Sequence, residues 1–269
     1  MKTKVYILDN GWLECDPNWM VSFSTLATRK QKECQHQWIE IPVYMVLIDH
    51  PEGRILYDLG CHPEAMNGYW PEGMVDVFPY YHQPEQTLVE QLKLLHLTPK
   101  DIPTVILSHM HLDHAGNLHL FEHADVYVHQ KDFSYGQTLV HLSRAKEKHG
   151  AYIKADLEVP VKDFHLVEED FELVPGVEII TLPGHTPGLL GIIVHLEHEG
   201  SLIFPQDAVY TRVNYGPPAK ASGIMHDSVA FFASIEKVRA YEKKYQAKVM
   251  FSHDMEFFKT IKKAPAYYD

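Results

Sequence analysis

The sequence predicts an α+β protein in which two mixed β-sheets lie face to face, with helices on their outer sides. Short runs rich in β-branched and aromatic residues occur in both halves of the chain. Each group of runs is followed by a segment with helical periodicity, and the strict β–α alternation of a single parallel sheet is absent. These observations together favour two packed sheets over one continuous sheet.

The expected strands are short and are bounded by turn residues such as Pro51, Gly53, Pro175, Gly176 and Gly200. In chain order they are KVYIL (4–8), PVYMVLI (42–48), RILYDLG (54–60), TVILS (104–108), DVYVH (125–129), VEIITL (177–182), GIIVHL (191–196), SLIFP (201–205) and KVMFS (248–252).

The expected helices show apolar residues spaced three or four apart. Leucines at 88, 92 and 95 predict a helix within residues 84–97, and apolar residues at 231, 235 and 238 predict one within 227–245. A third helix is expected within 130–148.

The composition limits what the protein does. Of 269 residues, 45% are hydrophobic, and no linker, low-complexity tract or repeat interrupts them, so we expect one domain over residues 1–269. The net charge of −12 argues against a nucleic-acid partner, because neutralising phosphates requires a basic surface. We expect no membrane partner, because no stretch is apolar enough for a span or a signal peptide. Three cysteines without a pairing pattern fit a reducing compartment, so we expect a cytoplasmic protein.

A cluster of metal-ligand side chains stands where the strand 104–108 ends. The stretch SHMHLDHAGN (108–117) places His109, His111, Asp113 and His114 within six residues. On an extended segment, residues two apart point the same way, so His109 and His111 can reach one ion together. Asp113 and His114 lie in the turn that follows and can serve a second ion. The spacing therefore predicts a metal site.

One loop cannot complete two coordination shells, so further ligands must come from later segments. Three later strands are each followed by such a residue: His185 in TLPGHTPGLLG, Asp207 in LIFPQDAVY and His253 in VMFSHDME. Functional side chains usually lie on loops at the ends of a rigid sheet. This repeated placement predicts that the four segments converge.

The four motifs HMHLDH, GHTPG, PQDA and FSHD occur in the order expected of the metallo-β-lactamase superfamily, which the chain resembles over nearly its whole length. The resemblance implies a four-layer αβ/βα sandwich with the site at one edge, and a supporting role behind the metal loop for Asp58. It also implies one ion on His109, His111 and His185, a second ion on Asp113, His114 and His253, and a bridge by Asp207. Two Zn²⁺ ions per chain suit this ligand set, and Co, Mn or Fe also fit it. Two such metal ions held side by side indicate a hydrolytic reaction.

Tyr210 follows Asp207 by three residues, in DAVYT. A turn at the strand end can bring its phenol over the metals, where it can stabilise a developing oxyanion. This arrangement, with STLAT, the stretch from LEVPVKDF to GHTPG, and DSVAFFASI, resembles the quorum-quenching N-acyl-homoserine lactonases. The resemblance implies that a metal-bridging hydroxide attacks the lactone carbonyl of an N-acyl-homoserine lactone. Asp113 would then carry a proton to the departing ring alkoxide.

An acyl tail also needs an apolar channel. Two segments with little regular periodicity, PNWMVSF and MNGYWPEGMVDVFPYY, supply candidates for it: Met20, Tyr69, Trp70, Met74 and Phe78. The same loops could instead cover the core or, with the C-terminal AYYD, form the contact of a homodimer.

Some features depart from the lactonase pattern, and two other functions stay open. Leu112 stands where lactonases of this branch often have Phe, and FPQ precedes Asp207 in place of an apolar stretch. A thioester hydrolase of the glyoxalase II kind has nearly the same metal shell, but the lysines at 259, 262 and 263 show no matching arrangement for glutathione. A non-catalytic ligand sensor on the same fold is the other alternative. A zinc β-lactamase is less favoured, because many of these enzymes have a cysteine ligand where this chain has Asp207.

Overall fold

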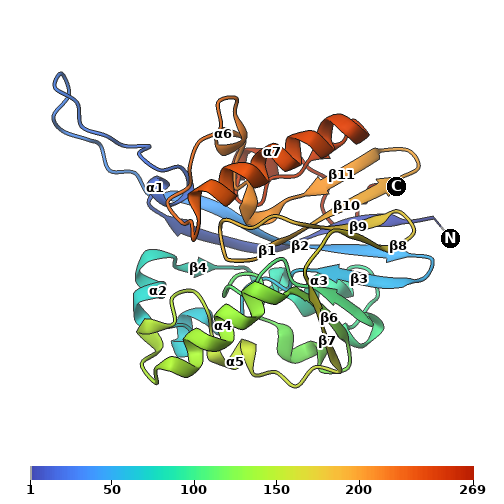
Figure 1. Cartoon of the computed structure of the whole chain (residues 1–269). Coiled ribbons are helices and arrows are strands. Elements are labelled where there is room, and N and C mark those ends of the chain that lie inside the picture. Colours follow the sequence, from blue (N-terminus) through green and yellow to red (C-terminus); the bar gives the residue numbers. More distant parts are fainter. Residues whose placement is uncertain (1) are drawn as a thin grey trace.

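The computed structural model describes residues 2–269 and contains two mixed sheets that face each other, with helices outside (Figure 1). The seven-stranded sheet has the order β4 (Tyr80–Tyr81), β1 (Lys4–Cys15), β2 (Ile39–His50), β3 (Gly53–Tyr57), β5 (Thr104–Ile106), β6 (Asp125–His129) and β7 (Asp163–Val167). The five-stranded sheet has the order β12 (Lys248–Val249), β11 (Gly200–Phe204), β10 (Leu190–Leu196), β9 (Val177–Thr181) and β8 (Phe171–Val174). The predicted fold class is confirmed.

Each sheet contains both parallel and antiparallel pairs. In the larger sheet β1, β2, β3 and β4 pair antiparallel, whereas β3, β5, β6 and β7 pair parallel. In the smaller sheet only β11 and β12 are parallel. Central strands covered on both faces are buried continuously, as β2 is from Ile41 to Ile48, which explains why their sequences show no polar alternation.

The helices cover the outer faces of the sheets. The two longest are α4 (Gln130–Leu142) and α7 (Ser228–Tyr245), and α3 (Leu88–Lys93) is shorter. The remaining α-helices each span one or two turns: α1 (Pro17–Met20), α2 (Glu72–Val77), α5 (Lys154–Leu157), α6 (Arg212–Tyr215) and α8 (Met255–Phe258). In Figure 1, α7 lies over the smaller sheet, and α4 and α5 lie on the side of the larger sheet.

Two predicted helices are shorter than the sequence indicated. The segment 84–97 contains a 3₁₀ turn at Pro84–Gln86, which is followed by α3. Thr87 is the N-cap of α3, and its side-chain oxygen accepts a hydrogen bond from the Glu90 amide. The segment 130–148 is α-helical only to Leu142, because Ser143 has extended backbone, and it ends in a separate 3₁₀ turn at Lys146–Lys148. The strands β4, β7 and β8 were not predicted, since β4 has two residues and β7 and β8 are largely exposed.

The main core lies between the sheets. It joins Val46 and Tyr57 of the larger sheet to Ile179, Ile192 and Phe204 of the smaller one, and all five are at least 95% buried. A second core fills the space between the larger sheet and the helices α3 and α4. The inner face of α7 joins the main core through Phe231, Ile235 and Val238, as its spacing predicted.

Three further features complete the fold. Residues 21–38, between α1 and β2, contain no helix or strand and extend away from the body of the protein (Figure 1). Within residues 2–269, no helix combines the length and apolar character needed to cross a membrane. Cys15, Cys34 and Cys61 are free thiols.

Candidate metal centre

The loop after β5 carries the HMHLDH motif, and buried polar contacts fix its path. Asp58, just after β3, accepts hydrogen bonds from the Ser108 amide (2.7 Å) and the Ser108 hydroxyl (2.8 Å). Asp132, at the start of α4, accepts one from the Met110 amide at 2.8 Å. Gly116 packs so closely against the backbone of residues 60–62 that a β-carbon there would lie 2.3 Å from the backbone nitrogen of His62. Hydrogen bonds therefore hold the metal loop to the end of β3 and to the start of α4.

Three histidines form the first ligand group. The Nε2 atom of His185 lies 3.1 Å from Nε2 of His109 and 3.0 Å from Nδ1 of His111. Zinc–nitrogen bonds of about 2.0–2.1 Å in a tetrahedral shell place ligand nitrogens roughly 3.3 Å apart, close to these distances. Burial lowers the pKa of His109 and His185, and it lowers the pKa of His111 to about 3. Neutral imidazoles with free lone pairs are the form that binds metal.

The second group contains Asp113, His114, Asp207 and His253. The Oδ2 atom of Asp113 lies 3.4 Å from Nε2 of His114 and 3.7 Å from Nε2 of His253. Burial alone would lower the pKa of both histidines, but the surrounding carboxylates raise the pKa of each, and that of His114 well above its ordinary value. The carboxylates therefore favour a positive charge between these side chains, which a bound cation would supply.

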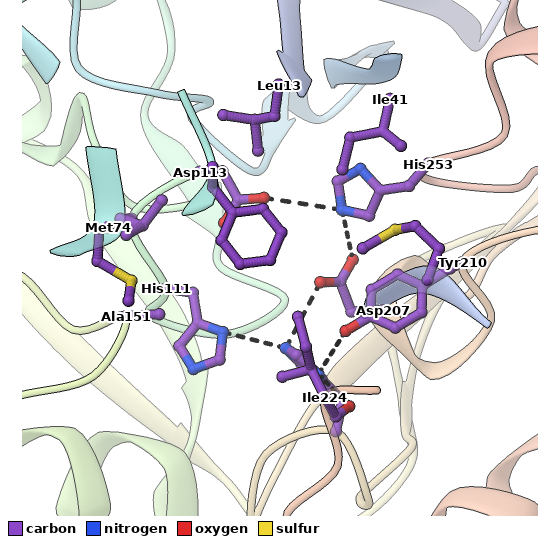
Figure 2. Close-up of a pocket in the computed structure, with 14 residues that line it drawn as sticks. Leu13, Ile41, Met74, His111, Asp113, Ala151, Asp207, Tyr210, Ile224 and His253 are labelled. Carbon is purple, nitrogen blue, oxygen red and sulfur yellow. Dashed lines mark hydrogen bonds and ion pairs between the residues drawn. The ribbon is translucent and has the colours of Figure 1, made fainter. Parts of the chain in front are cut away.

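Asp207 belongs to the second group and also faces the first, so it lies where the two groups meet (Figure 2). Its Oδ2 atom is 3.5 Å from Nε2 of both His185 and His114, and its Oδ1 atom is 3.1 Å from Nε2 of His253. Burial would raise the pKa of this carboxyl, yet His253 and His114 hold its pKa well below the usual range. It is an anion that faces both ligand groups at once.

The donor set fits a pair of divalent cations. Nε2 of His114 and Oδ1 of Asp207 are buried, and within the described residues their ion-pair contacts lack the geometry of a hydrogen bond. Both face the space between the ligand groups, and unpaired buried polar atoms at such a point are explained by a bound ion. The seven residues predicted from the sequence are therefore all brought together in this one place.

The far nitrogens of the ligand histidines are also engaged. Nδ1 of His114 lies 2.8 Å from Asp58, and Nδ1 of His253 lies 3.0 Å from the Pro42 carbonyl. A histidine that binds metal through Nε2 carries its proton on Nδ1, so these acceptors set the tautomer and the orientation of each ring. Asp58 occupies the supporting position that the family resemblance implied.

Tyr210 reaches the same centre from beyond Asp207. It is 1% exposed, and its hydroxyl lies 2.7 Å from Nδ1 of His185. With Nε2 of His185 on a metal, Nδ1 carries the proton and the phenol oxygen accepts it, which leaves the phenol O–H free to donate elsewhere. Burial, with the charges of Asp207 and Asp113, raises the pKa of Tyr210 well above its ordinary value, so the group stays a donor.

An apolar cavity opens above the ligands. It measures about 450 Å³ including its open mouth, and the walls contain Leu13, Met20, Ile41, Met74, Phe78, Leu112, Ala151 and Ile224. Of the residues expected to contact an acyl tail, Met20, Met74 and Phe78 line this cavity, whereas Tyr69 and Trp70 lie outside its walls. Leu112, which departs from the lactonase pattern, is part of the wall.

The comparisons with known proteins agree with this geometry. The family model of the metallo-beta-lactamase superfamily matches residues 38–238. The chain belongs to the metallo-β-lactamase superfamily. N-acyl homoserine lactonase AiiB of Agrobacterium fabrum is 36% identical to it over the full length of both chains.

Two solved superfamily structures are also similar over this whole chain. A mutant of Bacillus thuringiensis AiiA with N-decanoyl-L-homoserine at its active site has a TM-score of 0.84 and 26% identity, and both chains are covered completely. An N-acyl homoserine lactone hydrolase with N-hexanoyl-L-homoserine at its catalytic metal centre has a TM-score of 0.83, again with 26% identity and complete coverage of both chains.

Tyr69 does not line the cavity and instead forms a hydrogen bond with a buried carboxyl group. Its hydroxyl donates a 2.5 Å hydrogen bond to Oδ1 of Asp156 on α5, and its ring stacks on His62. Asp156 is 1% exposed, and its other oxygen has no partner among the described residues. Burial raises the pKa of Asp156 to about 7, although the hydrogen bond from Tyr69 opposes the shift.

This buried carboxyl predicts a pH-dependent stability. The folded state keeps a proton on Asp156 that the unfolded state releases above about pH 4, so rising pH destabilises the fold until about pH 7. Replacing Asp156 by Asn removes this titration. We expect Asp156→Asn and the parent chain to have similar free energies of unfolding near pH 4.5, with the variant more stable by about 3 kcal/mol at pH 8.

Urea unfolding of metal-free protein between pH 4.5 and 8 measures this difference. Tyr69→Phe is the companion variant, because among residues 2–269 it removes the one side-chain donor to the Asp156 carboxyl and should destabilise the fold most at high pH. Parallel pH curves for Asp156→Asn and the parent chain would contradict the prediction.

Proposed function

We propose that this protein opens the lactone ring of N-acyl-homoserine lactones, with two Zn²⁺ ions held by the seven ligands. The observation that carries the proposal is Asp207 between two ligand groups, with the Tyr210 phenol beside it at the base of an apolar cavity. The lactonase names of the relatives support the substrate class. Zinc is proposed because imidazole and carboxylate ligands suit it.

The bound ions would supply a hydroxide nucleophile at neutral pH and polarise the lactone carbonyl. The residues of the chain provide the rest of the reaction. Tyr210 donates its O–H to the carbonyl oxygen as negative charge develops there. The ring C–O bond then breaks. Asp113, which lines the cavity, takes the proton of the new carboxyl group and passes it to the departing alkoxide. The product carries one new carboxylate and one new hydroxyl, and one acid equivalent is released at neutral pH.

The structure gives less support to glutathione thioesters. Lys259 and Lys262, which could bind the carboxylates of glutathione, form ion pairs with Glu256 (2.7 Å) and Glu199 (2.5 Å). The acyl cavity is lined mainly by apolar side chains, as a fatty acyl tail requires.

Acid release in a pH-stat tests the proposal directly. N-butanoyl- and N-decanoyl-homoserine lactone are supplied to protein whose metal content is measured on the same sample. Rapid acid release with about two metals per chain supports the lactonase. Fully metallated protein that binds the lactones and leaves them intact indicates a sensor, and consumption of thioesters alone indicates the glyoxalase II reaction.

The cavity wall predicts how acyl-chain length affects the rate. Phe78→Ala removes a ring that a long tail contacts, which should lower kcat/KM for the decanoyl lactone roughly 30-fold, equivalent to about 2 kcal/mol of lost burial. The butanoyl substrate should lose less than about threefold. Phe232→Ala, the same truncation at a side chain 38% exposed on α7, is the control. Equal losses for both substrates would show that Phe78 supports the fold and not the tail.

We also propose that residues 1–269 act as one domain in the cytoplasm. Both sheets contribute to one core, and the three free thiols are compatible with a reducing compartment. A homodimer stays a prediction. Tyr268 of the C-terminal AYYD pairs with Val5 within the same chain, which leaves the aromatic loops as the candidate contact. Light scattering of the purified protein measures its mass in solution and decides between monomer and dimer.

A further inference from the structure

A buried hydrogen bond joins the two sheets directly beneath the metal centre. The side-chain amide of Gln206 donates to Oδ2 of Asp58 at 2.6 Å. Asp58 follows β3 of the larger sheet, and Gln206 follows β11 of the smaller one. The two residues are 0% and 1% exposed. The bond therefore crosses between the two halves of the fold that supply the metal ligands.

Each end of this bond is next to a ligand. Asp58 also accepts from Nδ1 of His114 at 2.8 Å, so it orients one ligand of the larger sheet. Gln206 immediately precedes Asp207 and begins the 3₁₀ turn that presents this carboxylate. A chain of contacts thus runs from His114 through Asp58 and Gln206 to Asp207.

The backbone conformation and the buried side chain of Gln206 both lower the stability of the fold. Its backbone has φ of 45°, and Asp58 has φ of 60°, which is the left-handed region that side chains other than glycine rarely adopt. The Oε1 atom of Gln206 is buried without a partner in the described chain. Turning the amide over would point this oxygen at the Asp58 carboxylate, so the orientation is fixed. An unpaired buried acceptor lowers the stability of the fold, a cost that an apolar side chain would avoid.

We propose that Gln206 is a positioning residue for the metal centre. Through Asp58 it sets the position of Asp207 relative to His114, so that ligands from opposite sheets meet one ion. Asp58 holds the loop after β5, and Gln206 ties the turn after β11 to the same carboxylate. The inference rests on the metal centre of the proposed function and not on its substrate.

Metal binding without any lactone tests this role. Gln206→Leu keeps the approximate size of the side chain and removes the donor. Loss of a contact that orients metal ligands typically weakens metal affinity 10–100-fold. We expect a loss of this size for one of the two ions, measured with Co²⁺ against a competing chelator, together with an altered cobalt absorption spectrum.

Gln91→Leu is the matched control. Gln91 is also buried, and its amide both accepts from the Asp9 backbone and donates to the Glu85 carbonyl, each at 2.9 Å, and neither partner is a metal ligand. Gln91→Leu should lower the melting temperature of the metal-free protein, because it leaves two backbone groups unpaired, but only Gln206→Leu should change cobalt affinity and spectrum. Gln206→Asn, which keeps the amide on a shorter side chain, serves if the leucine variant does not fold, and it should weaken cobalt binding as well.

Wild-type cobalt affinity and spectrum in a folded Gln206 variant would overturn the proposal. An equal loss of affinity in Gln91→Leu would do so too, since it would reduce the effect to general destabilisation. The readout requires no turnover, so a protein that opens no lactone can still confirm the role of Gln206, and an active lactonase can still disprove it.

Discussion

Replacing Asp207 by Ala is expected to abolish lactone hydrolysis and to reduce the metal content below two ions per chain. This carboxylate faces His185 and His114 with one oxygen and His253 with the other. Without it, the two ligand groups share no residue, and the positive charge gathered around them lacks its central anion. Two ions contribute several kcal/mol of transition-state stabilisation, so we expect kcat/KM to fall by about 10³-fold or more.

The matched control is Asp170→Ala. Asp170 also accepts several hydrogen bonds, from Thr181, Lys237 and Tyr241, but it lies in the turn between β7 and β8. Metal content and acid release are measured on both variants. If Asp207→Ala retains two metals and near-normal turnover, the carboxylate is not the bridge, and the two-ion centre itself is in doubt.

The sequence predicted the ligands better than it predicted their surroundings. His109 and His111 are two apart at a strand end, and His185, Asp207 and His253 each follow an apolar run, so spacing and strand ends were enough to find them. Convergence of the four segments required only that both sheets present these ends at one edge, which the structure confirms.

The contacts behind the ligands left no such pattern. Asp132 lies in the first turn of α4, where an acidic residue is ordinarily explained by the helix dipole, yet it accepts a hydrogen bond from the Met110 amide inside the metal loop. Gln206 was visible only as a departure from an apolar stretch, and its partner Asp58 is 148 residues away in the chain. The Gln206–Asp58 pair depends on how the two sheets pack, and the Met110–Asp132 pair depends on how α4 lies against the metal loop. Local periodicity encodes neither arrangement.

The acyl cavity shows the same limit. Met20, Met74 and Phe78 line it, but Trp70 and Tyr69, from the same aromatic segment, face elsewhere. The segment 65–78 combines an irregular π-helical turn with α2, so neither a period of two nor one of 3.6 applies throughout it. Composition identified the right segment, and only the fold separates its members.

Tyr210→Phe isolates the contribution of one hydrogen-bond donor to the reaction. The substitution keeps the buried ring, which packs beside Leu13, Met20 and Ile41, and removes only the hydroxyl. Removing one preorganised donor to an oxyanion typically lowers kcat by about 10²–10³-fold, and we expect a loss in that range. KM and metal content should change little, because the ring and the ligand nitrogens stay in place.

The measurement must distinguish this role from simple support of His185. The phenol oxygen lies 2.7 Å from Nδ1 of that ligand, so a Phe there could act by loosening the metal centre. The Ile224 carbonyl lies 3.2 Å from the same nitrogen and can still accept its proton in the variant. Cobalt affinity unchanged from wild type, with kcat reduced, assigns the hydroxyl to the transition state. If cobalt affinity and kcat fall together, Tyr210 acts through His185, and the lactone carbonyl is polarised without it.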